Sequence, residues 1–107
     1  MTNAESLFLD RLKTVAQMVI PSGGKAWLYG SRARGDSHRE SDWDLLILIH
    51  KEKITSKDED DISYPFVELG WRNATAVSPQ LYTFDEWSKL QQTPYFQNVE
   101  HDKLPLI

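Results

Sequence analysis

The chain has 107 residues, no cysteine and a formal net charge of −4, which fits one domain over residues 1–107 with one hydrophobic core. The lack of cysteine excludes disulfide frameworks and thiol nucleophiles. The negative net charge argues against a protein that binds nucleic acid through a basic charge spread over its whole surface. The longest apolar run, Leu45 to Ile49, is far shorter than the ~20 residues of a membrane-spanning helix. Since the charged N-terminal stretch is also unlike a secretion signal, we expect a cytoplasmic protein.

Residues 3–20 have the pattern of an amphipathic helix, because apolar side chains recur at spacings of four and three residues. These side chains are Phe8, Leu12, Val15 and Val19. Asn3 and Ser6 are both suitable as caps of its first turn, and the Pro-Ser-Gly-Gly segment 21–24 ends it.

Two short strands follow, with a polar loop between them. Residues 25–29 predict a buried strand, and the continuous run 43–49 predicts a strand buried on both faces. Residues 30–41 are rich in glycine, serine and arginine, which is typical of a loop with room for one helical turn.

The next part of the chain predicts an exposed acidic loop, a helix and a third strand. Residues 50–61 are polar, and a helix over about 60–73 accommodates Pro65 only in its first turn. Residues 75–83 predict the third strand, and Pro79 within it indicates the edge of a sheet or a bulge.

The last part of the chain predicts two short helices. Thr83 caps the first together with Glu86, and the second begins at Thr93 with Pro94 as its first residue. The order of elements predicts an α/β fold, a small mixed three-stranded sheet with helices packed on it.

Two features of residues 28–49 point to phosphate and metal chemistry. Gly30 and Ser31 follow a strand and start a helical turn, where backbone N–H groups and a hydroxyl can hold a phosphate. Asp42 and Asp44 are two residues apart at the start of a strand, so both carboxylates lie on one face with Cα atoms about 7 Å apart. Such a pair of carboxylates beside a phosphate cradle predicts a Mg²⁺ site for a nucleotide.

The first part of the loop, residues 30–39, is also basic, because it has Arg32, Arg34 and Arg39 but only one acidic residue, Asp36. Arginine suits bidentate contact with phosphate, although the same side chains could form a solvated face. Likewise, the carboxylate pair could be a polar strand entrance without metal, and Ser31 could serve only as a helix cap.

Together these residues resemble the DNA polymerase beta-like nucleotidyltransferase superfamily, in particular its minimal nucleotidyltransferases. The family pattern is a Gly-Ser after a strand and an Asp-x-Asp entering a hydrophobic strand. Here ten residues separate Ser31 from Asp42. The subfamily's Arg-x-Arg-Gly and Ser-Asp are present as residues 32–35 and Ser41-Asp42, and residues 93–99 resemble its closing helix.

The resemblance implies a polymerase beta palm-like fold and a nucleotidyltransferase that moves an NMP from an NTP to a hydroxyl. It implies up to two Mg²⁺ ions on Asp42 and Asp44 and a triphosphate held by Gly30 and Ser31. Arg32 or Arg34 balances the phosphate charge, and the sequence leaves open which of them points inward. The resemblance also implies a protein partner, a HEPN-type toxin that the chain modifies as its antitoxin.

One departure from the family pattern favours a second hypothesis. Active members carry a third carboxylate on the next strand, where this chain has Ser78 and Gln80. The alternative is therefore a catalytically weak or inactive module that binds and neutralises a partner protein. A polymerase or a DNA-binding repair protein is disfavoured, because the chain lacks a basic groove along its length.

Overall fold

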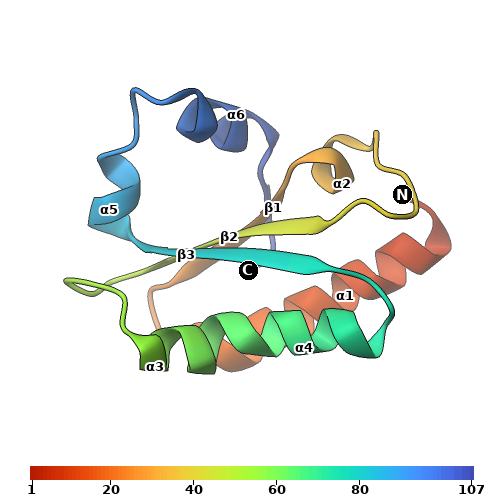
Figure 1. The fold of residues 1–107 in the computed structure, drawn as a ribbon, viewed down its shortest axis with the longest axis horizontal. Helices are drawn as coiled ribbons and strands as arrows, with labels where there is room; N and C mark the ends of the chain where they lie inside the picture. The colour runs from red at the N-terminus through yellow and green to blue at the C-terminus, as the bar shows by residue number, and fades with distance from the viewer.

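The computed structural model describes residues 1–107 as a four-stranded sheet with helices on both faces (Figure 1). The strand order is β3-β2-β1-β4, with β2 parallel to β3 and antiparallel to β1, and β4 antiparallel to β1. The strands are β1 Lys25–Tyr29, β2 Trp43–Ile49, β3 Val77–Thr83 and β4 Leu104–Pro105. The mixed α/β class is confirmed.

The expected count of three strands is wrong, because the last residues of the chain add β4. This strand has two residues, and one of them is a proline without an N–H group, so no strand pattern marks it in the sequence. Its place beside β1 is fixed by tertiary contact, including the hydrogen bond from Leu106 N–H to the carbonyl of Ala26 at 2.8 Å.

The helices are α1 Asn3–Val19, α2 Ser31–Arg34, α3 Ser56–Asp58, η1 Glu59–Ser63, α4 Tyr64–Arg72, α5 Phe84–Ser88 and α6 Pro94–Asp102. In Figure 1, α1 and α4 cover one face of the sheet, and α5 and α6 lie over the other. None of these helices has both the length and the apolar character that crossing a bilayer demands.

Threonine residues cap four of the helices, α1, α3, α5 and α6. Thr2 caps α1 in a capping box with Glu5, so the expectation of Asn3 or Ser6 as the cap is wrong. Thr83 caps α5 and Thr93 caps α6 as expected, and in each case the hydroxyl accepts a hydrogen bond from the N–H three residues on.

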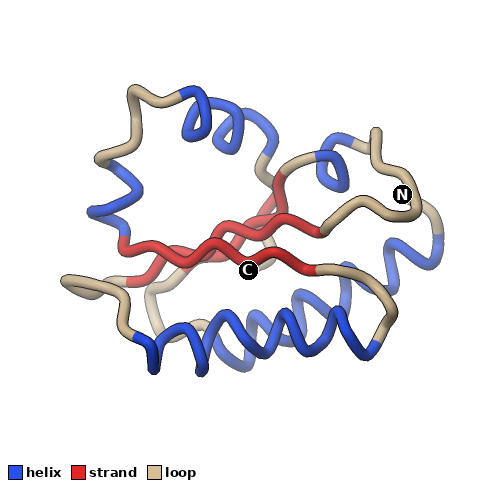
Figure 2. Tube along the Cα trace, in the orientation of Figure 1, coloured by secondary structure: helices blue, strands red, loops and turns tan.

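Residues 50–55 form the expected loop, whereas residues 56–61, which include the acidic run, are helical, so the expectation of a loop is wrong for this second half. Helix α3 starts at a Thr55 cap and runs through the π-helical turn η1 directly into α4, as the continuous helical coil of Figure 2 shows. Pro65 lies in the first turn of α4 as predicted. Because a proline ring clashes with the carbonyl four residues back, the wider π turn before it lets the helix continue.

The alternation of β2 creates two separate hydrophobic layers. Leu45 and Ile47 face α1 and α4 in a core of 14 buried residues, whereas Leu46 and Leu48 face α5 and α6 in a smaller cluster around Trp87. Strand β2 is therefore buried on both sides, as its continuous apolar sequence predicted.

We expect Leu45→Ala to lower the free energy of unfolding by about 3 kcal/mol, because it leaves a cavity in the larger core. Leu45 is fully buried, whereas Leu7 on α1 is 62% exposed, so Leu7→Ala is the matched control and should change stability by less than about 0.5 kcal/mol. Urea unfolding of both variants measures the difference. Equal losses would contradict the placement of Leu45 in the core.

Candidate active site

The glycine that opens the predicted cradle lies in direct contact with one carboxylate of the predicted metal site. Tyr29 at the end of β1 pairs with Asp44 on β2, which brings the next residue, Gly30, beside the Asp44 side chain. Gly30 has φ +77°, and a Cβ atom at this position would lie 2.6 Å from Oδ2 of Asp44. The position therefore accepts only glycine, both for its backbone conformation and for space.

The two carboxylates share the sheet face that α5 and α6 cover. Asp44 is half-buried and lies opposite Ser78 in the parallel register with β3. Asp42 is exposed just before β2, and its Oδ2 accepts a hydrogen bond from the Ser78 hydroxyl at 3.3 Å. Ser78 thus occupies the place beside the pair where the family resemblance led us to look for a third carboxylate.

The electrostatics of the pair favour a bound cation. Burial raises the pKa of Asp44, and the neighbouring charge of Asp42 raises it further, while Arg34 acts in the opposite direction. No cluster of three or more histidine, aspartate or glutamate side chains suited to a metal ion occurs in the structure. Two carboxylates completed by phosphate oxygens are a donor set that Mg²⁺ commonly uses, so the residues present fit this ion.

Helix α2 carries the N–H groups of the predicted cradle. Gly30 is its N-cap residue, and the Gly30 carbonyl accepts hydrogen bonds from Ala33 and Arg34 N–H, both at 3.0 Å. The N–H groups of Ser31 and Arg32 precede these and have no acceptor within the helix. Together with the half-buried Ser31 side chain, they can donate hydrogen bonds to an anion at this end of the sheet.

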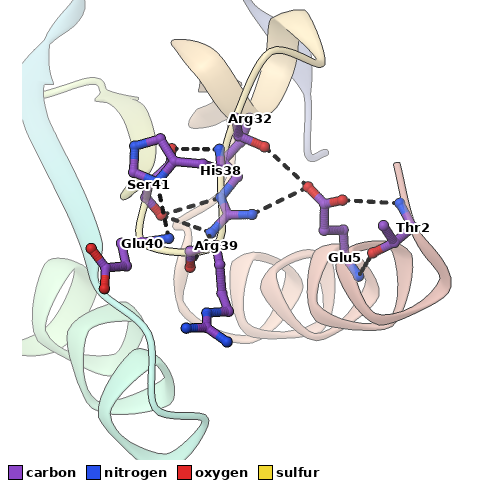
Figure 3. Close-up of polar contacts among 8 residues, drawn as sticks. Thr2, Glu5, Arg32, His38, Arg39, Glu40 and Ser41 are labelled. Atoms are coloured by element: carbon purple, nitrogen blue, oxygen red, sulfur yellow. Dashed lines mark hydrogen bonds and ion pairs between the residues drawn. The ribbon is translucent and has the colours of Figure 1, made fainter.

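Arg32 turns into the protein and organises the loop (Figure 3). Its guanidinium donates to the Ser41 carbonyl at 2.8 Å and to Glu5 at 3.2 Å, and it lies 4.7 Å from the ring centre of Trp43. The side chain is buried. Its donors are therefore engaged within the chain, which makes Arg32 a positioning residue for the loop that leads to Asp42.

Arg34 lies on the carboxylate side. Its guanidinium pairs with Asp36 at 3.1 Å and with Asp102 at the end of α6 at 2.7 Å, and its charge acts on Asp44. The structure thus separates the two arginines that the sequence left undecided. Asp102 has no signal in the sequence, because it reaches the site only when α6 packs over the sheet.

Ser41 shapes the loop rather than the cradle. Its hydroxyl accepts a hydrogen bond from His38 N–H at 2.9 Å, while its carbonyl accepts from Arg32. Gly30, Ser31, Asp44 and Arg34 thus lie together at one end of the sheet. Ser41 lies in the loop between α2 and β2 and contacts His38 and Arg32 instead.

Three tyrosines line the same sheet face next to the site, and none of them belongs to the site residues predicted from the sequence. The Tyr29 and Tyr95 hydroxyls are 3.4 Å apart, and burial raises the pKa of Tyr95 to about 12. Burial likewise raises the pKa of Tyr82 to about 12. All three are therefore neutral hydrogen-bonding groups at pH 7. The alternation of β1 could have indicated Tyr29, but nothing in the sequence indicates Tyr95.

We expect Gly30→Ala to destabilise the protein more than Gly35→Ala, although both glycines have positive φ values, +77° and +85°. At Gly35 the backbone is left-handed (φ +85°, ψ +11°), which costs alanine about 1–2 kcal/mol. Gly30 has ψ −159°, a region that essentially only glycine adopts, so alanine costs at least as much there. In addition, the new Cβ atom of Gly30→Ala would collide with Asp44, whereas no atom lies within 4 Å of the Cβ position at Gly35. Chemical denaturation of both variants gives the comparison, and equal losses would contradict the close packing at Gly30.

The stability contribution of Glu5 should depend on pH. The backbone N–H of Thr2 is the main reason that the pKa of Glu5 falls from 4.5 to about 2, with Arg32 and Ser37 assisting. Since the folded-state pKa is lowered, the ionised carboxylate stabilises the protein above pH 4.5, and this contribution disappears as the pH falls towards 2.

The variant Glu5→Gln keeps an oxygen for Thr2 but loses the charge opposite Arg32. We expect it to lower the free energy of unfolding by about 1–2 kcal/mol at pH 7 and by much less near pH 2.5. Thermal unfolding across this range measures the difference. A loss that is the same at both pH values would mean that the charge is not the cause.

Comparison with known proteins places this site in a family. Residues 16–69 match the family described as Polymerase beta, Nucleotidyltransferase. The matched segment is half of the chain and includes Gly30, Ser31, Asp42 and Asp44. No curated protein matches the sequence.

Among solved structures, one described as the crystal structure of a toxin-antitoxin with AMP-PNP has a similar fold. It is 19% identical in sequence, and the match covers 92% of this chain and 72% of the other with a TM-score of 0.60. At this identity the likeness concerns the fold alone, and it agrees with the family match. The chain belongs to the polymerase beta-like nucleotidyltransferase family.

Proposed function

We propose that the chain binds an NTP with Mg²⁺ and transfers its NMP group to a hydroxyl of a partner protein. The observation that carries the proposal is the contact between Gly30 and Asp44, which joins the phosphate cradle to the carboxylate pair. In the proposed reaction, the acceptor oxygen forms a bond to the α-phosphorus, and the bond from that phosphorus to the β-phosphate oxygen breaks. Pyrophosphate leaves, and the acceptor proton is lost to solvent.

Asp42 and Asp44 are the residues that would hold Mg²⁺. When bound, the ion would neutralise phosphate charge and stabilise the in-line displacement. Ser31 and the first N–H groups of α2 bind the terminal phosphates, and the absent side chain of Gly30 lets Asp44 lie directly against the backbone that carries these groups. Arg34 adds positive charge on the same side, where Asp102 holds its guanidinium in place.

The partner in this proposal is a HEPN-type toxin, and the transferred group is AMP. The family resemblance in the sequence supports the toxin, and the similar fold of a toxin-antitoxin structure with AMP-PNP supports both a protein partner and an adenine nucleotide. We place the reaction in the cytoplasm because it consumes an NTP.

A second candidate function rests on Ser78. A serine stands beside Asp42 and Asp44 at the place expected for a third carboxylate, and its hydroxyl donates to Asp42. A hydroxyl cannot take the proton of an attacking alcohol as a carboxylate does. This observation favours a module that keeps the nucleotide site and neutralises its partner by binding alone.

Titration calorimetry with Mg²⁺-ATP tests the nucleotide site. The double variant Asp42→Asn/Asp44→Asn should bind at least about 100-fold more weakly, which corresponds to about 2.8 kcal/mol. The double variant Asp60→Asn/Asp61→Asn removes the same charge from exposed positions on η1 and should bind like the wild type. Equal affinity of both double variants would contradict the proposed site.

Transfer of labelled AMP from ATP to the partner separates the two functions. Transfer by the wild type that Asp42→Asn abolishes supports the enzyme, whereas nucleotide binding without transfer supports the binding module. For the module, Ser78→Asp would place a carboxylate next to Asp42, and we expect it to create or raise transfer by about tenfold or more. No gain with Ser78→Asp would mean that Ser78 is not what limits the reaction.

A further inference from the structure

A groove lies outside the carboxylate site, on the α1 side of the loop that Arg32 organises. One hollow of about 660 Å³ lies between α1, the loop after α2 and the turn after α4, and a second of about 540 Å³ shares Arg39, Ala74 and Thr75 with it and extends to Trp71. We call the two together the arginine groove, defined by Phe8, Arg11, Arg39, Trp71, Ala74 and Thr75. Neither Asp42 nor Asp44 lines it.

The groove is basic on an acidic protein. Three arginines and one carboxylate line the larger hollow, and Arg39 and Glu40 line the smaller one, while the chain as a whole carries a net charge of −4. Arg32 and Glu5 pair with each other. The positive charge left over belongs to Arg11 and Arg39, which are both exposed.

The charges of Arg11 and Arg39 have no acidic partner in the structure. The Arg11 guanidinium donates to the neutral amide oxygen of Asn73, and the Arg39 guanidinium forms neither a hydrogen bond nor an ion pair. In Figure 3 the Arg39 side chain extends away from the polar network of the loop, while its backbone carbonyl accepts a hydrogen bond from Arg32. Both guanidinium groups are thus available to an anion from outside.

Apolar surface accompanies these charges. Phe8 and Trp43 form part of the wall, and Leu7 at the rim is 62% exposed. Trp71 at the far end is 65% exposed, and its ring meets that of Tyr64 edge to face with centroids 5.9 Å apart. Exposed aromatic and arginine side chains together are the residues that most often anchor protein interfaces.

We propose that the arginine groove docks an acidic, extended segment of a partner protein. Arg11 and Arg39 bind its carboxylates, and an apolar side chain of the segment packs on Trp71. The proposal does not depend on the nucleotide site. It gives the chain a second contact surface besides the nucleotide site. One loop connects the two, because Arg39 lies three residues before Asp42.

The chemistry of the groove favours a protein segment over nucleic acid. Guanidinium groups match carboxylates in planar, bidentate pairs, whereas phosphate backbones are bound by rows of cations. Here only two unpaired cations face outward, and no lysine lines either hollow. The exposed Trp71 and Leu7 also provide apolar contact that a phosphate backbone does not use.

The probe is a fluorescein-labelled pool of 12-residue peptides in which each position is Asp, Glu, Leu or Phe. A matched pool has Asn and Gln in place of the acids, and a 12-nucleotide oligothymidine serves as the nucleic-acid probe. Fluorescence anisotropy with the full chain should show binding of the acidic pool, at least about tenfold weaker binding of the amide pool, and a loss of affinity as salt rises.

Variants locate the contact. We expect Arg39→Gln and Trp71→Ala each to weaken binding of the acidic pool about tenfold. Arg72→Gln removes the same charge from an exposed position on α4 outside the groove and should have no effect. Since Arg39 has no partner in the fold, its substitution should leave the thermal unfolding temperature unchanged.

The double variant Asp42→Asn/Asp44→Asn keeps the test separate from the nucleotide site, because it should bind the acidic pool like the wild type. The proposal is overturned by an acidic pool that does not bind, by equal binding of the amide pool, or by an affinity that Arg39→Gln leaves unchanged. Tighter binding of the oligothymidine would identify a nucleic-acid site instead. Self-association in sedimentation that Arg39→Gln abolishes would identify a second copy of this chain as the occupant.

Discussion

The buried guanidinium of Arg32 connects parts of the chain that are far apart in sequence. It joins Glu5 at the start of α1 to the carbonyl of Ser41 and packs against Trp43 at the start of β2. A buried guanidinium without these partners would be costly, so the pairing fixes the course of the loop between them. Because that loop leads directly into Asp42, the position of the carboxylate pair depends on a contact with α1.

The second constraint is the alternation of β2, which is buried on both sides by different helices. Its odd-numbered residues fill the larger core under α1 and α4, so Asp42 and Asp44 must lie on the side of α5 and α6. The smaller hydrophobic cluster on that side does not cover the start of β2. Asp42, just before the strand, is therefore exposed, and Asp44 is half-buried. A rigid strand in a well-packed core therefore supports the polar groups, which suits chemistry that needs fixed positions.

The loop between α2 and β2 has two functional sides under these proposals. On one side it presents the cradle and the carboxylates, and on the other it presents Arg39 to the arginine groove. Ser78 decides how the first side works, since a hydroxyl in place of a carboxylate retains metal and nucleotide binding more readily than proton transfer. A surface for a partner would be needed by either function, because both the enzyme and the neutralising module act on another protein.

The sequence by itself determined the α/β class, three of the four strands and most helices, because these follow from local periodicity. The spacing of Gly30, Ser31, Asp42 and Asp44 predicted the candidate site. The tertiary structure alone decided the inward turn of Arg32, the Asp102 partner of Arg34, the nearby tyrosines and the short β4. Each of these depends on contacts between residues distant in the chain. Such contacts leave no periodic signal in a single sequence, since only the packing of α1, α6 and the last residues against the sheet brings the partners together.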